Sequence, residues 1–475
     1  MILSLAEIAA ITDGQIHGDL QGSDALINGL STDTRSMLAG ALFVALVGDS
    51  FDPHEKIESG DASQAAAALV QRKVNAAMPQ VVVKDTYKAL QQLAAAWRKR
   101  FSLPVIGVTG SNGKTSVKEL IKQILRAHLA SSGGEVLATV GNLNNHIGVP
   151  ITLCDLNESH RFAVIEMGAN HAGEIAELAK LAEPNIGVIT NIGPAHLEGF
   201  GSIEGVARAK AEMYQNLSAN GVAVVNADEH YRGELEKEIG ERMQISFGVE
   251  KPADVSGKQI ASDQLEIITP MGEVRVKPQV LGMHALLNTL AATAVGLALG
   301  LDLEDIKTGI ERTQAVPGRL VRVEGLAGAT VLDDSYNANP ASLAAALDVQ
   351  AQEPGEHWLV LGDMGELGDE SVFMHKKTAD IAKQFGVTRL FAYGELTKHC
   401  VKEFGSGAIH FSSHKKLIEV LQNELSSEVC VLVKGSRAMQ LEKIVAGIRT
   451  NKTIANKKMN GKTNGQNMEH NEHVA

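Results

Sequence analysis

The segment that most constrains the fold covers residues 105–120 and reads VIGVTGSNGKTSVKEL. It begins with a short apolar run typical of a buried strand, and its two loop glycines, Gly110 and Gly113, follow directly. A helical pattern comes next, with apolar residues recurring three or four positions apart: Val117, Leu120, Ile121, Ile124, Leu125 and Leu129. A glycine loop between a strand end and a helix start gathers backbone N–H groups around an anion. The segment therefore predicts a phosphate-binding loop in an α/β sheet.

The sequence of this loop departs from the two common glycine motifs. A general phosphate loop has a glycine five residues before its Gly-Lys pair, but that position here is Val108. Dinucleotide folds use Gly-x-Gly-x-x-Gly, whereas the glycines here are Gly107, Gly110 and Gly113. The position between a strand and a helix favours a nucleotide loop. A turn that merely joins the two elements is the alternative.

Polar residues that suit phosphate chemistry occur in the loop and after neighbouring strands. Lys114 is placed to reach the outer phosphates, and the Thr115 hydroxyl is placed to ligate Mg²⁺. Glu166 ends the apolar run FAVIEM, and Asn191 and His196 follow the run IGVIT. Because parallel strands present their carboxyl ends to one ligand crevice, we expect these residues at one rim. A solvated or capping glutamate and a structural histidine are the alternatives.

Lys210 occupies an unusual position in a predicted helix over residues 202–217. It falls within the apolar stripe of that helix, which consists of Ile203, Val206, Ala207, Met213, Tyr214 and Leu217. One interpretation is a lysine that extends its ammonium group along the stripe to water. The other is a desolvated lysine with a lowered pKa, which is open to unusual chemistry.

A second polar cluster occurs in the last third of the chain. The sequence VLDDSYNANP ends a predicted strand with Asp334 and Asn337 among its polar residues, and Pro340 then starts a helix. Arg319 lies just before this strand and is a plausible clamp for phosphate. The cluster could reach ribose or phosphate, or it could be a cap and turn.

Strands and helices alternate along most of the 475 residues, a length that suggests roughly three domains. We expect an α/β protein with a small N-terminal α/β domain over residues 1–102. A central P-loop ATPase domain with a mostly parallel sheet would cover residues 103–314, and a C-terminal Rossmann-like α/β domain residues 315–450. Residues 451–475 are rich in Asn, Lys and Gly, and we expect a disordered polar tail.

Composition excludes several classes of function. The formal net charge of −12 argues against general binding of nucleic acid or membrane surfaces. The N-terminal stretch lacks a basic region and contains Glu7, so it does not resemble a signal peptide, and the longest apolar run is too short to span a bilayer. Cys154, Cys400 and Cys430 are scattered, which favours buried thiols in a reducing compartment. We expect a cytoplasmic protein without membrane insertion.

Over residues 25–450 the sequence resembles the Mur ligase family, which builds the peptide stem of peptidoglycan. The shared motifs are STDTR, TGSNGKT, GNLNNHIGVP, DDSYNANP, GDMGELG and VKGSRAMQLE. The last two most resemble members that join D-alanyl-D-alanine to UDP-N-acetylmuramoyl-tripeptide. The resemblance implies a monomeric, ATP-dependent acid–amino-acid ligase that uses Mg²⁺, works through an acyl phosphate and supports cell-wall synthesis, cell shape and division.

The resemblance also implies roles for matching residues. The nucleotide site would comprise Thr109, Gly110, Ser111, Asn112, Gly113, Lys114, Thr115, Ser116, Asn288, Arg319, Asp334 and Asn337. The UDP-muramoyl-peptide would contact Ser31, Thr32, Asp33, Thr34, Arg35, Asn142, Asn144 and Asn145, and the dipeptide Lys434, Ser436 and Arg437. Mg²⁺ would be held by Thr115, Glu166, His196 and Lys210, the last as a carbamylated lysine. Lys114, Lys210 and His196 would be the catalytic residues.

The chain departs from the family pattern at one point. The family's His-Asn pair beside the adenine reads His284-Ala285 here, although Asn288 still matches. We expect ATP binding to persist, but the motif does not indicate which contacts to adenine are made near position 285. One alternative is another ligase of the same superfamily, either the ligase that adds the third stem residue or a folate polyglutamate synthase, and the GDMGELG and VKGSR segments argue against both. A second alternative is a P-loop ATPase that acts as a switch, but a switch would not need both the N-terminal STDTR segment and the basic VKGSR segment.

Overall fold

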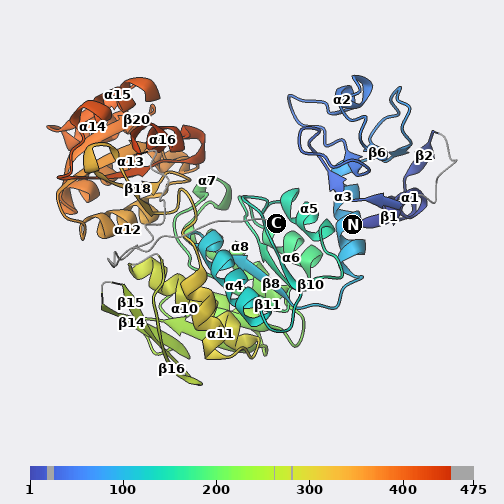
Figure 1. The fold of residues 1–475 in the computed structure, drawn as a ribbon, viewed down its shortest axis with the longest axis horizontal. Helices are drawn as coiled ribbons and strands as arrows, with labels where there is room; N and C mark the ends of the chain where they lie inside the picture. Colours follow the sequence, from blue (N-terminus) through green and yellow to red (C-terminus); the bar gives the residue numbers. More distant parts are fainter. Residues whose placement is uncertain (19–25, 262, 280–281, 451–475) are drawn as a thin grey trace, which may run out of the picture.

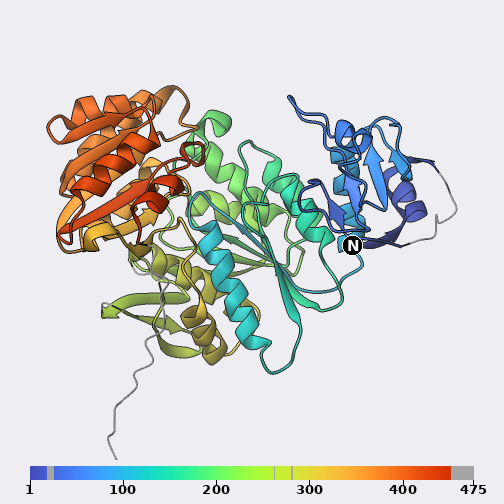
Figure 2. The ribbon, with the colours of Figure 1, turned by 45° about the horizontal axis from the view of Figure 1, so that its top comes forward.

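The computed structural model describes residues 1–18, 26–261, 263–279 and 282–450, so the expected tail at residues 451–475 lies outside it. The described strands form three larger sheets and one two-stranded ribbon. The sheets follow one another along the chain as three units, with the central unit between the other two (Figure 1 and Figure 2). The expected α/β class is confirmed.

The N-terminal unit is built on a five-stranded sheet. Its order is β2 (Gln15–His17), β7 (Gln80–Val82), β6 (Ala67–Val70), β5 (Leu42–Val44) and β4 (Leu30–Ser31). The ribbon pairs β1 (Ile2–Ser4) with β3 (Leu26–Asn28), and the helices are α1 (Leu5–Thr12), α2 (His54–Glu58) and α3 (Thr86–Arg98). The α3 side chains tie this unit to the next, because Trp97 Nε1 donates to the Leu156 carbonyl and Arg98 Nε to the Ala182 carbonyl, each at 2.9 Å.

The central unit has a nine-stranded sheet. Its order is β16 (Gly272–Val276), β15 (Gln264–Thr269), β14 (Val255–Ala261), β13 (Met243–Gly248), β12 (Val222–Asn226), β11 (Ile186–Ile189), β8 (Val105–Thr109), β10 (His160–Glu166) and β9 (Glu135–Ala138). Neighbouring strands from β14 to β9 are parallel. The pair β14 and β15 and the pair β15 and β16 are antiparallel. A largely parallel sheet agrees with the sequence prediction.

Helices cover both faces of the central sheet, which explains why its strands are continuously apolar. One face packs on α4 (Lys114–His128), α10 (Met283–Ala298) and α11 (Leu303–Arg312). The other packs on α5 (Gly148–Cys154), α6 (Glu174–Ala182) and α8 (Ile203–Gln215). Alternate residues of β8 show the principle, since Ile106 and Val108 belong to the first core and Val105 to the second. The remaining α-helices of this unit are α7 (Leu197–Phe200) and α9 (Arg232–Ile239).

The C-terminal unit has a six-stranded sheet that is parallel apart from its edge strand β17. Its order is β17 (Val321–Glu324), β18 (Thr330–Asp334), β22 (Val429–Lys434), β19 (Glu356–Gly362), β20 (Val387–Tyr393) and β21 (Ala408–Phe411). Helices α12 (Pro340–Gln350), α13 (Ser371–Gln384) and α14 (Thr397–Phe404) cover one face, and α15 (His414–Glu424) and α16 (Glu442–Ile448) cover the other. Pro340 starts α12 as predicted, after an Asn339 cap whose side chain accepts from Ser342 N.

Two predictions from composition can be compared with the structure. Cys154, Cys400 and Cys430 are all buried and free, as expected. Among the described residues, none of the helices combines the length and the apolar character needed to cross a membrane.

Candidate active site

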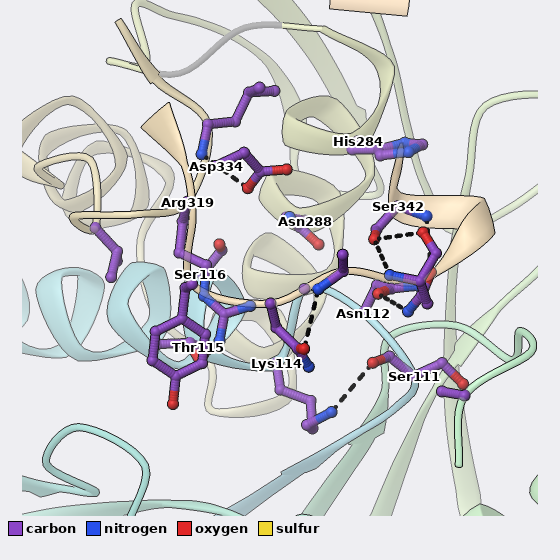
Figure 3. Close-up of a pocket in the computed structure, with 18 of the residues that line it drawn as sticks. Ser111, Asn112, Lys114, Thr115, Ser116, His284, Asn288, Arg319, Asp334 and Ser342 are labelled. Atoms are coloured by element: carbon purple, nitrogen blue, oxygen red, sulfur yellow. Dashed lines mark hydrogen bonds between the residues drawn. The ribbon is translucent and has the colours of Figure 1, made fainter. Parts of the chain in front are cut away.

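A cavity of about 960 Å³ lies where the central unit meets the C-terminal unit. Its walls come from the carboxyl ends of the central strands, the start of α10 and the loops after β18 and β22. Figure 3 shows Lys114, Thr115, Arg319 and Asp334 around this space. The predicted rim of the sheet is therefore a lined cavity, shared between two units.

The glycine loop after β8 has a backbone that requires its glycines. Gly110 has φ +141°, and an added Cβ would lie 2.0 Å from Thr190 Oγ1. Gly113 has φ +80°, and an added Cβ would lie 2.4 Å from Asn288 Oδ1. The loop therefore passes close to both neighbours and has no room for side chains at these points.

The neighbouring strand β11 fixes this loop through hydrogen bonds. Thr190 Oγ1 donates to the Asn112 carbonyl at 2.6 Å, and the Asn112 N–H donates to Asn191 Oδ1 at 2.9 Å. Asn191 thus lies at the loop, as its position after a strand predicted. Sequence reasoning missed Thr190, because the role of this residue depends on which strand pairs with β8.

Lys114 is half-buried at the start of α4. Its Nζ donates to the carbonyls of Gly110 at 2.7 Å and Ser111 at 3.2 Å. Burial lowers the pKa of Lys114 to about 8, and the nearby Arg319 guanidinium adds to the shift. The ammonium group is therefore held against the loop, at the position expected for a phosphate-binding lysine.

The Glu166 carboxylate at the end of β10 is buried, with 2% of the residue exposed. Asn144 Nδ2 donates to Glu166 Oε1 at 2.7 Å, and the Glu166 N–H donates to Thr139 Oγ1 at 2.9 Å. Glu166 Oε2 is buried and has no hydrogen-bond partner among the described residues. Such an oxygen costs free energy unless a further group binds it, so Glu166 is not a solvated or capping residue.

Lys210 is 1% exposed, so its side chain does not extend to water. Its Nζ lies 5.3 Å from the centre of the Phe200 ring. Burial lowers the pKa of Lys210 to about 7, with a further contribution from the Lys114 ammonium. The structure therefore supports the interpretation of a desolvated lysine, although Lys210 is not among the described residues that line the cavity.

His196 lines the cavity just before α7 and has a left-handed backbone with φ +53°. Its Nδ1 contacts the carboxylate of Glu366, which also has a left-handed backbone with φ +61°. The contact with His196 lowers the pKa of Glu366. Glu366 belongs to the GDMGELG segment, but sequence reasoning gave it no individual role. Two strained residues from different units thus meet at the cavity.

Two further contacts join the units across the cavity. Arg319 lies over the Tyr336 ring at 4.0 Å and reaches Thr115 Oγ1 at 3.5 Å. Asn339 Nδ2 donates to Asn112 Oδ1 at 2.8 Å. The C-terminal unit therefore contacts the glycine loop after β8 directly.

The predicted site residues divide into three groups. The described cavity-lining set contains Ser111, Asn112, Gly113, Lys114, Thr115, Ser116, Asn142, Asn144, Asn145, Glu166, His196, Asn288, Arg319, Asp334, Asn337, Lys434, Ser436 and Arg437. Thr109, Gly110 and Lys210 are buried and lie outside this set, and the Thr109 hydroxyl donates to the Met167 carbonyl at 2.8 Å. Residues 31–35 lie in the N-terminal unit and are absent from the described lining, and Arg35 there pairs with Asp33 at 2.6 Å.

A metal ion at the cavity would need ligands other than a cluster of His, Cys, Asp and Glu side chains. Within the described parts of the chain, no three His, Cys, Asp or Glu residues cluster in a way that could hold a metal ion. Glu166 and His196 nevertheless both line the cavity together with the Thr115 hydroxyl. His284 and Ala285 also line it, so the departure from the family motif lies in the same site.

Known proteins match both units that form the cavity. The family model for the Mur ligase middle domain matches residues 108–296, and that for the Mur ligase, glutamate ligase domain matches residues 318–437. A UDP-N-acetylmuramoyl-tripeptide–D-alanyl-D-alanine ligase of Escherichia coli (strain K12) is 40% identical over 445 residues, 92% of this chain and 97% of that protein. This chain belongs to the Mur ligase family.

Solved structures of Mur ligases have the same fold. Crystal structure I of MurF from Acinetobacter baumannii has a TM-score of 0.84 and 34% identity, covering 94% of this chain and 98% of the other. MurF ligase from Thermotoga maritima in complex with ADP has a TM-score of 0.76 and 27% identity, covering 89% and 97%. The expected family resemblance is confirmed over nearly the whole described chain.

Proposed function

We propose that the chain joins D-alanyl-D-alanine to UDP-N-acetylmuramoyl-tripeptide with cleavage of ATP, in the synthesis of peptidoglycan precursors. The main support is that one cavity is lined by the phosphate loop, by Glu166 and by Ser436 and Arg437 of the C-terminal unit. An enzyme that activates a carboxylate and then delivers an amine needs all three components in one space. The similar protein of Escherichia coli is a UDP-N-acetylmuramoyl-tripeptide–D-alanyl-D-alanine ligase, which agrees with this reaction.

The proposed reaction has two steps. The terminal carboxylate of the tripeptide attacks the γ-phosphate of ATP, which gives an acyl phosphate and ADP. The amine of the dipeptide then attacks the acyl carbon, phosphate leaves, and the amine loses a proton. The Lys114 ammonium and the loop N–H groups would stabilise the charge on the transferring phosphoryl group. The enzyme contributes mainly orientation, so approach of the C-terminal unit to the nucleotide is part of the mechanism.

The remaining nucleotide contacts would come from both units. Ser111, Asn112 and the other loop residues would surround the phosphates at the start of α4, because the N–H groups in the first turn of a helix lack partners within the helix and can bind an anion. Arg319 would clamp a phosphate from the opposite side, and its stacking on Tyr336 orients its guanidinium. Asn288, Asp334 and Asn337 would complete the nucleotide site.

The cavity fits a Mg²⁺ ion. The buried and unpaired Oε2 of Glu166 is a hard oxygen ligand of the kind that Mg²⁺ prefers. Thr115 and His196 would be further ligands, and Lys210 would join them as a carbamate, since a lysine with a lowered pKa is neutral enough to react with CO₂. When bound, Mg²⁺ would neutralise charge on the phosphates. Lys114, Lys210 and His196 are the proposed catalytic residues.

The UDP-muramoyl-peptide would extend from residues 31–35 in the N-terminal unit to Asn142, Asn144 and Asn145 at the cavity.

We propose domains over residues 1–102, 103–314 and 315–450, linked in that order. The boundary at 102 is crossed by a continuous apolar core, because the cluster around α3 extends to α5 and α6. We further propose a monomer that acts in the cytoplasm, where ATP is available.

A phosphate-release assay tests this function. The full chain is incubated with ATP, Mg²⁺ and UDP-N-acetylmuramoyl-tripeptide, and a panel of amines is added. We expect release to require both the nucleotide-sugar peptide and D-alanyl-D-alanine. Stimulation by a single amino acid would instead indicate another ligase of the superfamily, and release with no acceptor would indicate an ATPase switch.

A further inference from the structure

Lys434 and Asp334 form a buried ion pair at the carboxyl ends of two adjacent strands. They are the last residues of β22 and β18, and they lie opposite each other in the parallel register. Lys434 Nζ lies 2.5 Å from Asp334 Oδ2 and 2.9 Å from the Asn337 carbonyl oxygen. The two side chains are only 3% and 13% exposed. The ammonium group is therefore enclosed by the loop that follows β18.

This ion pair fixes a carboxylate that sequence reasoning assigned to the nucleotide. Asp334 Oδ1 accepts the N–H of Leu320 at 3.1 Å, so both of its oxygens are held. Leu320 directly follows Arg319, and its left-handed backbone has φ +55°. Lys434 thus binds the Asp334 carboxylate at Oδ2, and the N–H of Leu320, the residue after Arg319, binds it at Oδ1. Asp334 and Asn337, which both contact Lys434, line the cavity and are proposed contacts of the nucleotide.

We propose that Lys434 is a positioning residue for the nucleotide and does not bind the incoming dipeptide. This proposal rests on the proposed function, because it requires ATP in the cavity, and it revises the expected dipeptide role of Lys434. An ammonium group has three N–H donors, and two of them are already directed at Asp334 and Asn337. A ligand carboxylate would have to compete with a buried carboxylate for the same cation.

The electrostatics give Lys434 a second effect on the nucleotide. The Lys434 ammonium neutralises the charge of Asp334, which lies in a cavity that would hold a polyphosphate. Without the ammonium, the aspartate would be a buried and uncompensated negative charge, a costly arrangement. The loop would rearrange to expose the carboxylate, or the carboxylate would repel the phosphates. Either change weakens nucleotide binding before any dipeptide is present.

Arg437 lies three residues further along the same segment and provides a matched control. Its side chain is 56% exposed, and its guanidinium pairs with Glu442 on the surface at 2.8 Å. It also lines the cavity, and its guanidinium carbon is 5.7 Å from the centre of the Tyr336 ring. The exposed Arg437 guanidinium has further N–H donors beyond its pair with Glu442 and can bind the carboxylate of a dipeptide, whereas the enclosed Lys434 cannot.

The experiment compares Lys434→Met and Lys434→Gln with Arg437→Ala in the full-length chain. ADP binding is titrated by calorimetry without dipeptide, and KM values for ATP and for D-alanyl-D-alanine come from phosphate release. For Lys434→Met we expect the ADP Kd and the KM for ATP to rise about 10-fold or more, because a buried charge loses its partner. We expect the KM for the dipeptide to change less than about 3-fold, with the opposite pattern in Arg437→Ala.

The Gln variant separates the charge of Lys434 from its hydrogen bonds. It retains N–H donors without the charge, and we expect nucleotide binding intermediate between the parent and Lys434→Met. Because loss of a buried ion pair also lowers stability, the parent and all variants are measured at one common temperature, about 10 °C below the lowest melting temperature among them. If Lys434→Met does not fold, the Gln variant and the charge-retaining Lys434→Arg variant provide the same comparison.

Two results would overturn the proposal. One is an unchanged ADP Kd in the Lys434 variants, and the other is a KM for the dipeptide that rises more than the KM for ATP. Failure of the proposed function is a separate result, because the parent enzyme would then release no phosphate on addition of the dipeptide. The ADP titration would still decide whether Lys434 positions the nucleotide.

Discussion

The side-chain amide of Asn144 donates to Glu166 Oε1 at 2.7 Å, and this bond gives the two carboxylate oxygens different surroundings. Oε1 has a fixed partner, while Oε2 is buried with none among the described residues. The main chain of Glu166 is held as well, through its N–H to Thr139 Oγ1. The carboxylate therefore has one defined orientation, with a single oxygen left for a cation.

Replacing Asn144 should weaken the use of Mg²⁺. In Asn144→Ala the carboxylate of Glu166 loses the bond that orients it, and loss of such a supporting contact typically costs 10–100-fold in metal affinity or activity, so we expect a shift of about that size. The measurement is the Mg²⁺ concentration that gives half-maximal phosphate release. Val140→Ala is the control, since Val140 is an exposed residue of the same loop and is absent from the described cavity lining. An unchanged Mg²⁺ requirement with a raised KM for the nucleotide-sugar peptide would contradict this role.

The buried Lys210 side chain should lower the free energy of unfolding of the protein, a cost that its proposed catalytic role would explain. Its buried ammonium lacks a carboxylate partner among the described ion pairs, and burial lowers its pKa from 10.5 to about 7. We expect Lys210→Met to raise the free energy of unfolding by roughly 1–3 kcal/mol at pH 6. We also expect the variant to lose at least about 100-fold in activity if Lys210 holds the metal as a carbamate.

The stability effect of Lys210 has a definite pH dependence. Between pH 7 and pH 10.5 the unfolded chain binds a proton at this lysine that the folded chain does not, so the parent protein gains stability from this group as the pH rises. The difference in melting temperature between Lys210→Met and the parent should therefore be largest below pH 7 and should shrink towards pH 10. Calorimetry in CO₂-free buffer measures it. A variant that melts below the parent at pH 6 would show that the lysine is paired or solvated.

The three cysteines should be inert in the folded protein. Cys154, Cys400 and Cys430 are buried, and burial raises the pKa of each thiol to about 12. Since the thiolate is the reactive form, a water-soluble thiol reagent should label none of them in the native state and should leave phosphate release unchanged. Labelling in denaturant, counted by mass spectrometry, should reach all three. A rapidly modified thiol in the native protein would be incompatible with this burial.

Local patterns in the sequence were sufficient to predict much of this fold. The apolar stripe of α4 is buried as expected, because periodicity reports which face of a helix contacts a sheet. The apolar spacing gave no reason to expect burial of the polar residue Lys118. Lys118 is 1% exposed, because its Nζ donates to the Thr139 carbonyl at 2.7 Å and pairs with Glu119 at 2.7 Å. The spacing of apolar residues along a helix cannot reveal a hydrogen-bond partner that lies 21 residues away in the sequence.

The candidate site shows the same limit. Strand-end positions predicted Glu166 and His196 at one rim, because parallel strands end at the same edge of a sheet. The contact of His196 with Glu366 was not predicted, since it depends on how two units meet. The pairing of Lys434 with Asp334 was also missed, because it depends on β22 lying beside β18, although 100 residues separate them. Motifs identify which residues matter, and the topology decides what each one touches.

The close approach of Gly113 to Asn288 gives a last prediction with an internal control. Gly113 and Gly133 have nearly the same backbone, with φ +80° and +78°. An added Cβ at Gly113 would lie 2.4 Å from Asn288 Oδ1, whereas at Gly133 no described atom lies within 4 Å. Either Gly→Ala change should lower the free energy of unfolding by about 1–2 kcal/mol, because a left-handed backbone disfavours a Cβ.

Only Gly113→Ala should also impair the nucleotide site, because its methyl group displaces Asn288. We expect its ADP Kd to rise by more than about 10-fold, a loss of about 1.4 kcal/mol, while Gly133→Ala binds ADP as the parent does. Thermal melting and calorimetric titration of both variants measure the two effects separately. Equal ADP affinity in the two variants would mean that the contact between the loop and α10 does not matter for the nucleotide.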